Sequence, residues 1–95
     1  MPVYAVHYRY DDRSDERDDV RPSHRAYLQA LADQGVVLAR GPYVDADDPG
    51  ALIIVRAETA DDVAEFLDSD PFWLHGFISE RRVREWTQVG GPFLG

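Results

Sequence analysis

The sequence predicts an α+β domain in which two helices cover one face of an antiparallel sheet. Stretches rich in β-branched and aromatic residues alternate with stretches whose apolar residues recur at helical spacing, in the order β-α-β-β-α-β. That order is typical of the split βαβ arrangement. The chain has 95 residues, the length of one domain, and we expect a single domain over residues 1–95.

The first predicted strand covers residues 2–10, where Val and Tyr dominate. Successive side chains of a strand alternate between its two faces, so His7 and Arg9 point away from the tyrosines, toward either solvent or a ligand cleft. The charged run at 11–19 contains no apolar residue and predicts a solvated loop. The glycine and the spacing of a calcium-binding loop are missing from it.

The first helix is predicted over residues 20–34, where apolar side chains recur every three to four positions. Pro22 suits the first turn of a helix, where its missing N–H group costs nothing. Gly35 suits the left-handed residue that follows a helix. His24 is therefore expected in the first helical turn.

The next two strands are expected to form a hairpin. A short strand at 36–39 is ended by Gly41 and Pro42, and the residues at 45–50 are typical of a turn. The most apolar stretch of the chain follows at 51–57 and predicts a buried central strand.

The second helix is predicted over residues 58–69. Thr59 followed by Asp62 resembles a capping box at its start. Asp70 precedes a proline and should end the helix, because the residue before proline disfavours helical geometry. A short turn at 72–76 follows.

The last strand is predicted over residues 77–89. The apolar residues in its two halves would face opposite sides of the sheet under a strict alternation. A bulge near Arg81 and Arg82 would bring both halves to the same side. The residues at 90–95 form a tail that can cross to a partner subunit. The sheet face without helices would expose an apolar patch, so we expect a second copy of the chain to cover it.

The composition narrows the classes of function. The formal net charge is −8, which disfavours nucleic acid and anionic membranes as partners. The chain has no cysteine, which excludes disulfides, thiolate metal ligands and a cysteine nucleophile. No secretory leader or apolar run of membrane length is visible, so we expect a cytoplasmic protein.

Four short motifs occur in order along the chain. They are VRPSH at 20–24, GP at 41–42, DDPG at 47–50 and DPF at 70–72. Together with the β-α-β-β-α-β order, and over nearly the whole chain, this set resembles the YciI-related (YCII domain) family. The resemblance implies a ferredoxin-like fold of the dimeric α+β barrel type, and we expect a homodimer or a higher homo-oligomer. It also implies an active site built on a His–Asp pair, which maps onto His24 and Asp70.

His24 and Asp70 are the residues best suited to proton transfer. Imidazole can both accept and donate a proton near neutral pH. A carboxylate that orients one ring nitrogen leaves the other free to act as a base. Both residues are expected at helix ends on the same sheet face, where the two antiparallel helices can bring them together. The structural alternatives are a capping role for His24 and turn chemistry for Asp70.

Five further residues are candidates for binding the substrate. Arg21 and Arg17 precede His24 and can hold a carboxylate, or can pair with the surrounding acids on the surface. His7 and Arg9 can face a ligand or solvent. Gly41 can let the backbone approach a ligand closely, or can only end a strand. The aromatic residues of the last third of the chain can line a pocket or belong to the core.

Other chemistries fit the sequence less well. Ser23 is adjacent to His24, but neighbouring helix positions do not face each other, and a G-x-S-x-G motif is missing. The three histidines, at 7, 24 and 75, lack metal-binding spacing, and we expect neither a metal nor a cofactor. The leading hypothesis is a small metal-independent acid–base enzyme, of the isomerase, lyase or hydrolase type, acting on a small organic molecule. The rival is a non-catalytic dimeric ligand-binding or accessory domain.

Overall fold

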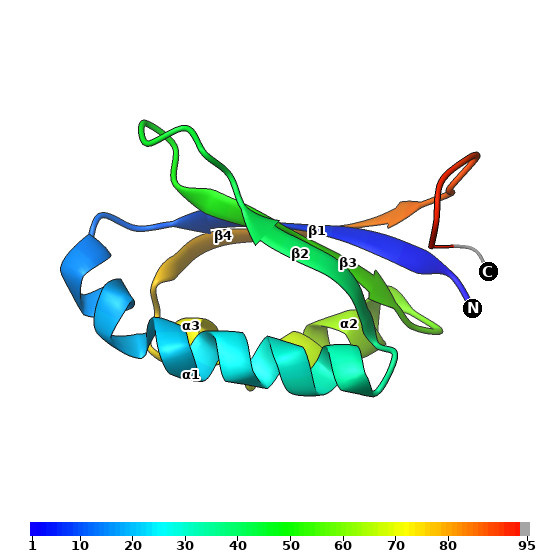
Figure 1. Cartoon of the computed structure of the whole chain (residues 1–95), viewed down its shortest axis with the longest axis horizontal. Coiled ribbons are helices and arrows are strands. Elements are labelled where there is room, and N and C mark those ends of the chain that lie inside the picture. Colours follow the sequence, from blue (N-terminus) through cyan, green and yellow to red (C-terminus); the bar gives the residue numbers. More distant parts are fainter. Residues whose placement is uncertain (94–95) are drawn as a thin grey trace.

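The computed structural model describes residues 1–93, which form a four-stranded antiparallel sheet with helices on one face (Figure 1). The elements are β1 (Val3–Tyr10), α1 (Ser14–Asp33), β2 (Val37–Pro42), β3 (Gly50–Arg56), α2 (Ala60–Leu67), α3 (Pro71–Leu74) and β4 (Ile78–Trp86). The predicted α+β class and ferredoxin-like β-α-β-β-α-β order are confirmed, with α3 as a short additional turn. The last two residues of the predicted 90–95 tail lie outside the described part of the chain.

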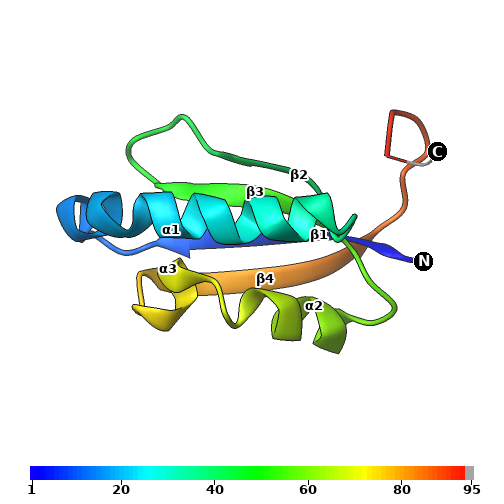
Figure 2. The same cartoon turned by 60° about the horizontal axis from the view of Figure 1, so that its bottom comes forward.

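The strand order β2-β3-β1-β4 places β1 and β3 at the centre of the sheet. Val6 pairs with Ile53 on one side and with Val83 on the other, so these three side chains share the face that the helices cover. Val6 and Ile53 are fully buried there. The helices contribute the other half of the core through Leu28, Leu31, Val63, Leu67 and Phe72. The core therefore lies between one sheet face and one helical layer. Figure 2 shows the sheet and the helices from a second direction.

Helix α1 begins at Ser14, so the predicted loop at 11–19 is wrong for most of its length. Asp15 and Glu16 occupy the first turn, where the partial positive charge of a helix N-terminus favours carboxylates. Arg17 is buried, with its guanidinium over the ring of Tyr10 at 4.7 Å. The aliphatic part of the Arg17 side chain packs where an apolar side chain would be expected. A search for apolar periodicity counts arginine as polar and therefore misses this part of the helix.

Because α1 begins early, Pro22 and His24 lie farther from its N-terminus than the sequence predicted. Pro22 lies inside the helix, not in its first turn, and His24 lies ten residues beyond Ser14. The predicted position of His24 at a helix start is therefore wrong. At the other end the prediction is confirmed: Gly35 has φ of +78° and follows the helix, as a left-handed glycine should.

Strand β2 continues to Pro42 instead of ending before it, which corrects the prediction. Because β2 is an edge strand, proline is tolerated there. The hairpin of β2 with β3 is confirmed. The bulge in β4 falls at Ser79, opposite Arg9 and Tyr10, and not near Arg81 and Arg82, which pair regularly with β1.

The predicted cap of α2 is confirmed, since the Thr59 hydroxyl accepts a hydrogen bond from the Asp62 backbone N–H at 3.1 Å. Within residues 1–93, no helix is long and apolar enough to cross a membrane. The tail folds back toward its own sheet as far as Phe93, whose carbonyl accepts a hydrogen bond from Arg56 at 2.8 Å. Pairing with a second copy is not tested by a single chain and stays a prediction.

Candidate active site

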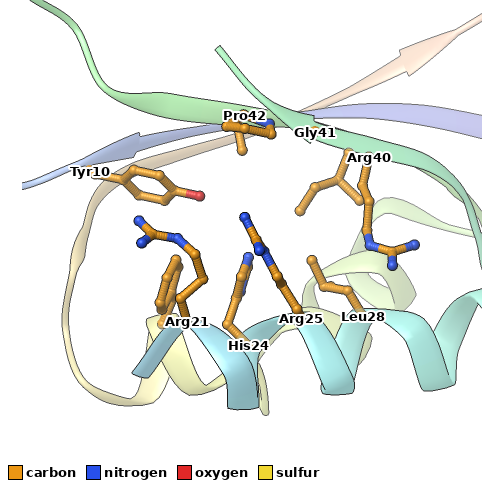
Figure 3. A pocket seen from close by; sticks show the side chains of 11 residues that line it. Tyr10, Arg21, His24, Arg25, Leu28, Arg40, Gly41 and Pro42 are labelled. Carbon is orange, nitrogen blue, oxygen red and sulfur yellow. The ribbon is translucent and has the colours of Figure 1, made fainter. Parts of the chain in front are cut away.

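A cavity of about 390 Å³ lies on the helical side of the sheet, between α1, α3 and the β2–β3 edge. Its volume suits a small organic ligand. The residues that line it are Tyr10, Arg21, His24, Arg25, Leu28, Arg40, Gly41, Pro42, Ala51, Ile53 and Phe72. Figure 3 shows the imidazole of His24 rising from α1 into this space.

His24 is held in place by its position on the inward side of α1. It precedes Leu28 by one turn and Leu31 by two, and all three side chains are buried. The imidazole stacks on the ring of Phe72, with centroids 3.8 Å apart and planes 5° from parallel. The ring therefore has one orientation, fixed by packing before any ligand binds.

Asp70 contacts His24 from behind the cavity, with Oδ1 2.7 Å from Nδ1 of the imidazole. Asp70 is fully buried, and its carboxylate accepts two further hydrogen bonds: the Phe72 backbone N–H reaches Oδ1 at 3.0 Å, and the Tyr8 hydroxyl reaches Oδ2 at 3.1 Å. A carboxylate surrounded by donors can only accept from His24, so Nδ1 carries the proton. The tautomer that results has Nε2 free as a base.

Asp70 occupies this position because the chain turns there. It is the N-terminal cap of α3, and the proline that follows is suited to the first helical position. We expected His24 at the start of the first helix and Asp70 at the close of the second, and both positions are wrong. In the structure α2 ends at Leu67, and Asp70 begins α3 and meets His24 well inside α1. The expected contact is present, although the helix ends do not produce it.

Two tyrosines of β1 flank the pair. Burial, and then the charge of Asp70, raise the pKa of Tyr8 far above its ordinary value, so its hydroxyl stays protonated and donates to Asp70. Tyr10 lines the cavity itself, and burial followed by the Asp70 charge raises its pKa to about 12 against the opposing effect of nearby arginines. Both phenols are therefore neutral donors at physiological pH.

Arginines from α1 and β2 line the cavity. Arg21 was named from the sequence, but Arg25 and Arg40 were missed, as was Tyr10. A signal for Arg25 was available, because Arg21 and Arg25 are four residues apart and so share one side of a helix. No local pattern indicates Arg40 or Tyr10, since both reach the cavity only through strand pairing.

The other sequence-named candidates lie apart from His24. Arg17 donates to the backbone carbonyl of Asp11 at 2.9 Å and packs on Tyr10, outside the cavity lining. His7 and Arg9 lie on the far face of the sheet, where they contact Tyr43 and Asp48 respectively. The structure does not bring these three together with His24 in one chain, and their predicted role in binding substrate stays untested.

Gly41 is brought to the cavity, where its backbone forms part of the wall. Among the aromatic residues of the last third of the chain, Phe72 lines the cavity. Phe77 belongs to the buried core. The described residues contain no group of three or more His, Asp or Glu side chains placed to share a metal ion.

The chain combines a ferredoxin-like sheet with a buried His–Asp pair beside a small cavity. These features place it in a class of small α+β proteins with a candidate acid–base site. The model of the YCII-related domain family matches residues 1–87, and the chain belongs to this family. The proteins named YciI of Escherichia coli O6:H1 and Shigella flexneri are each 34% identical over 86 residues, covering 82% of this chain and 88% of the relative.

Solved structures share the fold. One is the 5-chloro-2-hydroxyhydroquinone dehydrochlorinase of Burkholderia phenoliruptrix AC1100 in complex with 2,5-dihydroxybenzoquinone. It has a TM-score of 0.75 and 27% identity, over 90% of this chain and 93% of that one. An antibiotic biosynthesis monooxygenase has a TM-score of 0.59 at 14% identity, over 95% of this chain and 100% of its own, and at that identity it shows the fold alone.

Proposed function

We propose that this protein is a small acid–base enzyme that moves a proton on a small organic molecule. His24 takes and returns the proton through Nε2, and Asp70 orients the imidazole and stabilises its charged form. The observation that carries the proposal is the contact of 2.7 Å between His24 Nδ1 and Asp70 Oδ1 at the wall of a cavity. A base positioned in this way can contribute about 10² to 10⁴ in rate.

The proton transfer follows from the arrangement of the donors. A C–H or O–H bond of the substrate breaks, its proton moves to Nε2, and the electron pair moves into the substrate. The imidazolium that forms is adjacent to the carboxylate of Asp70. Because Asp70 is fully buried, water screens this attraction little, and the carboxylate stabilises the imidazolium strongly. The face-to-face contact with Phe72 keeps the ring aimed at the cavity throughout. In an isomerisation, His24 then returns the proton to another atom of the substrate. In an elimination, the electron pair from the broken bond forms a new double bond, the leaving group departs with its bonding electrons as an anion such as chloride, and His24 gives its proton to water.

The chemistry of one structural relative supports the proposal. A dehydrochlorinase removes hydrogen and chlorine from its substrate, and losing the hydrogen as a proton requires a base. That relative is 27% identical to this chain over most of both lengths. We therefore place elimination and isomerisation of small cyclic compounds first among the reactions to test.

The test uses solvent hydrogen exchange and chloride release. We would incubate the protein with 5-chloro-2-hydroxyhydroquinone and, separately, with small ketones, lactones and hydroxyquinones in heavy water. Chloride release and incorporation of deuterium are then followed by ion measurement and NMR. His24→Asn keeps a donor near the position of Nδ1 but removes Nε2, so activity should fall by about 10² or more while the fold is kept.

The matched control is His75→Asn, since His75 is an exposed histidine stacked on Phe77 outside the cavity. That variant should keep the wild-type rate. Full activity in His24→Asn would remove His24 from the mechanism. Ligand binding without exchange or chloride release for any compound would favour the non-catalytic binding domain instead.

A further inference from the structure

The cavity carries a charge opposite to that of the chain. The protein has 18 acidic and 10 basic residues, with a net charge of −8. Three of the ten basic residues nevertheless line the one cavity that contains His24, and none of its lining residues is Asp or Glu. A concentration of positive charge in the site of an acidic protein favours a negatively charged ligand.

The three arginines differ in how free they are to bind that ligand. Arg40 donates to the side chain of Gln29 at 2.8 Å, and Figure 3 shows its guanidinium turned away from the centre of the cavity. Arg21 is paired with Asp18 through one of its nitrogens. Arg25 has no carboxylate within ion-pair distance among residues 1–93, and Figure 3 shows it pointing into the cavity above His24. The side chain best placed to meet an anion is therefore Arg25.

Tyr10 adds a neutral donor at the same place. Its ring is fixed edge-on against Phe72, with centroids 5.5 Å apart, and Figure 3 shows its hydroxyl pointing into the cavity. Burial and then the charge of Asp70 raise the pKa of this phenol to about 12, so its hydroxyl stays protonated at neutral pH. The polar groups that face the ligand are thus hydrogen-bond donors, except for Nε2 of His24, which accepts.

We propose that the substrate is a small organic oxyanion, which Arg25 binds with help from Arg21 and the Tyr10 hydroxyl while the reacting proton faces Nε2 of His24. This inference rests on the proposed function of the same site and adds the class of substrate. The anionic oxygen belongs to a carboxylate or to an ionised enol or phenol. Guanidinium groups bind such delocalised oxyanions through paired N–H donors. They also offset the negative charge that the substrate gains when its proton leaves.

Binding is tested separately from turnover by NMR titration of the isotope-labelled full-length protein at low salt. The probes are benzoate as the carboxylate and 4-nitrophenolate as the ionised phenol. Their neutral counterparts are benzamide and nitrobenzene. The signals followed are the imidazole of His24 and the Arg side-chain N–H groups. One or both anions should bind about tenfold or more tightly than the neutral counterpart, and added salt should weaken that preference.

Two variants distinguish anion binding at a specific site from a general effect of the net charge. Arg25→Gln should weaken binding of the preferred anion about tenfold and leave its neutral counterpart unchanged. Arg84→Gln makes the same change in net charge on the far face of the sheet and should leave both unchanged. Equal affinity for the anions and their neutral counterparts, or an unchanged anion affinity in Arg25→Gln, would overturn the inference.

The two proposals fail in distinguishable ways. If the protein catalyses proton exchange but shows no preference for anions, the oxyanion inference is wrong and the acid–base function stands. If anions bind at Arg25 but no compound exchanges a proton, the binding site stands and the catalytic proposal does not. His24→Asn should keep anion binding, because the base does not hold the oxyanion.

Discussion

The imidazole of His24 and the carboxylate of Asp70 meet at 2.7 Å although they are 46 residues apart in the chain. The carboxylate is fully buried and also binds the Tyr8 hydroxyl and the first N–H group of α3. One acidic group therefore caps a helix, anchors a central strand and orients the candidate base. Substitutions at Asp70 should consequently affect both stability and activity.

Asp70→Asn tests this double role. The amide keeps one acceptor but cannot accept from three donors, so the free energy of unfolding should fall by about 1–3 kcal/mol. The single Nδ1–H tautomer of His24 should be lost in ¹⁵N NMR spectra, and proton-transfer activity should fall by about 10² or more. Asp68→Asn is the control, since the Asp68 side chain is about half exposed, pairs with Arg81 and lies outside the lining of the cavity. An unchanged tautomer in Asp70→Asn would contradict the prediction.

Tyr8→Phe removes one of the three donors without changing the size of the ring. The Tyr8 hydroxyl is buried and donates to Asp70 at 3.1 Å. Its loss should lower the free energy of unfolding by about 1–2 kcal/mol, measured by chemical denaturation. Tyr4→Phe, on the same face of β1, is the matched control and should change stability by less than about 0.5 kcal/mol. Equal effects of the two variants would show that the Tyr8–Asp70 bond contributes nothing.

Gly50→Ala should disturb the pairing of β1 with β3, at the first residue of β3. A Cβ atom at Gly50 would run into the backbone carbonyl oxygen of Tyr8, and backbone cannot move aside as a flexible side chain can. We expect the free energy of unfolding to fall by about 2–3 kcal/mol. Gly41→Ala is the comparison, because an added Cβ there meets nothing within 4 Å. If both variants unfold at the same denaturant concentration as wild type, the close approach of β1 and β3 is not as described.

Alkaline pH should destabilise the protein through its tyrosines. The pKa values of Tyr8 and Tyr10 are raised in the folded state, mainly by burial and then by the charge of Asp70, to about 12 for Tyr10. The folded state therefore holds these protons more tightly than the unfolded state, whose tyrosines titrate near pH 10. Their contribution to stability is complete below about pH 10 and is lost as pH rises toward about 12.

The measurement for this prediction is denaturation at several pH values, with phenolate absorbance recorded in parallel. All ten basic residues are Arg, so no lysine titrates in that interval. Tyr10→Phe should flatten the loss of stability. A free energy of unfolding that stays constant through this interval would show that neither phenol is perturbed.

We also keep the prediction that two copies of the chain pair. Figure 1 shows that the far face of the sheet carries no helix. Trp86, which pairs with Val3 on that face, is 40% exposed. A domain this small gains stability when it covers such a face. Light scattering should give twice the mass of one chain. A monomer at every concentration tested would leave the face to solvent or to another partner.

The sequence by itself determined the local features of the fold. Thr59 as a cap, Gly35 after a helix, the hairpin around residues 45–50 and the order of elements all depend on residues close together in the chain. Such features follow from backbone preferences and hydrophobic period, which a single sequence displays. The motif resemblance also selected His24 and Asp70.

Only the tertiary structure decided which distant side chains share the site. Arg40 and Tyr10 reach the cavity because of the register of β2 and β1. Alternation along β1 separates His7 from Tyr10 in the sequence, but only the packing of the helices decided which face holds the cavity. Near the start of α1 lies Arg17, whose guanidinium packs on Tyr10 where an apolar residue would be expected, so apolar periodicity did not reveal these first turns. Register and packing are set by contacts between segments far apart in the chain, and the local pattern of one segment carries no record of them.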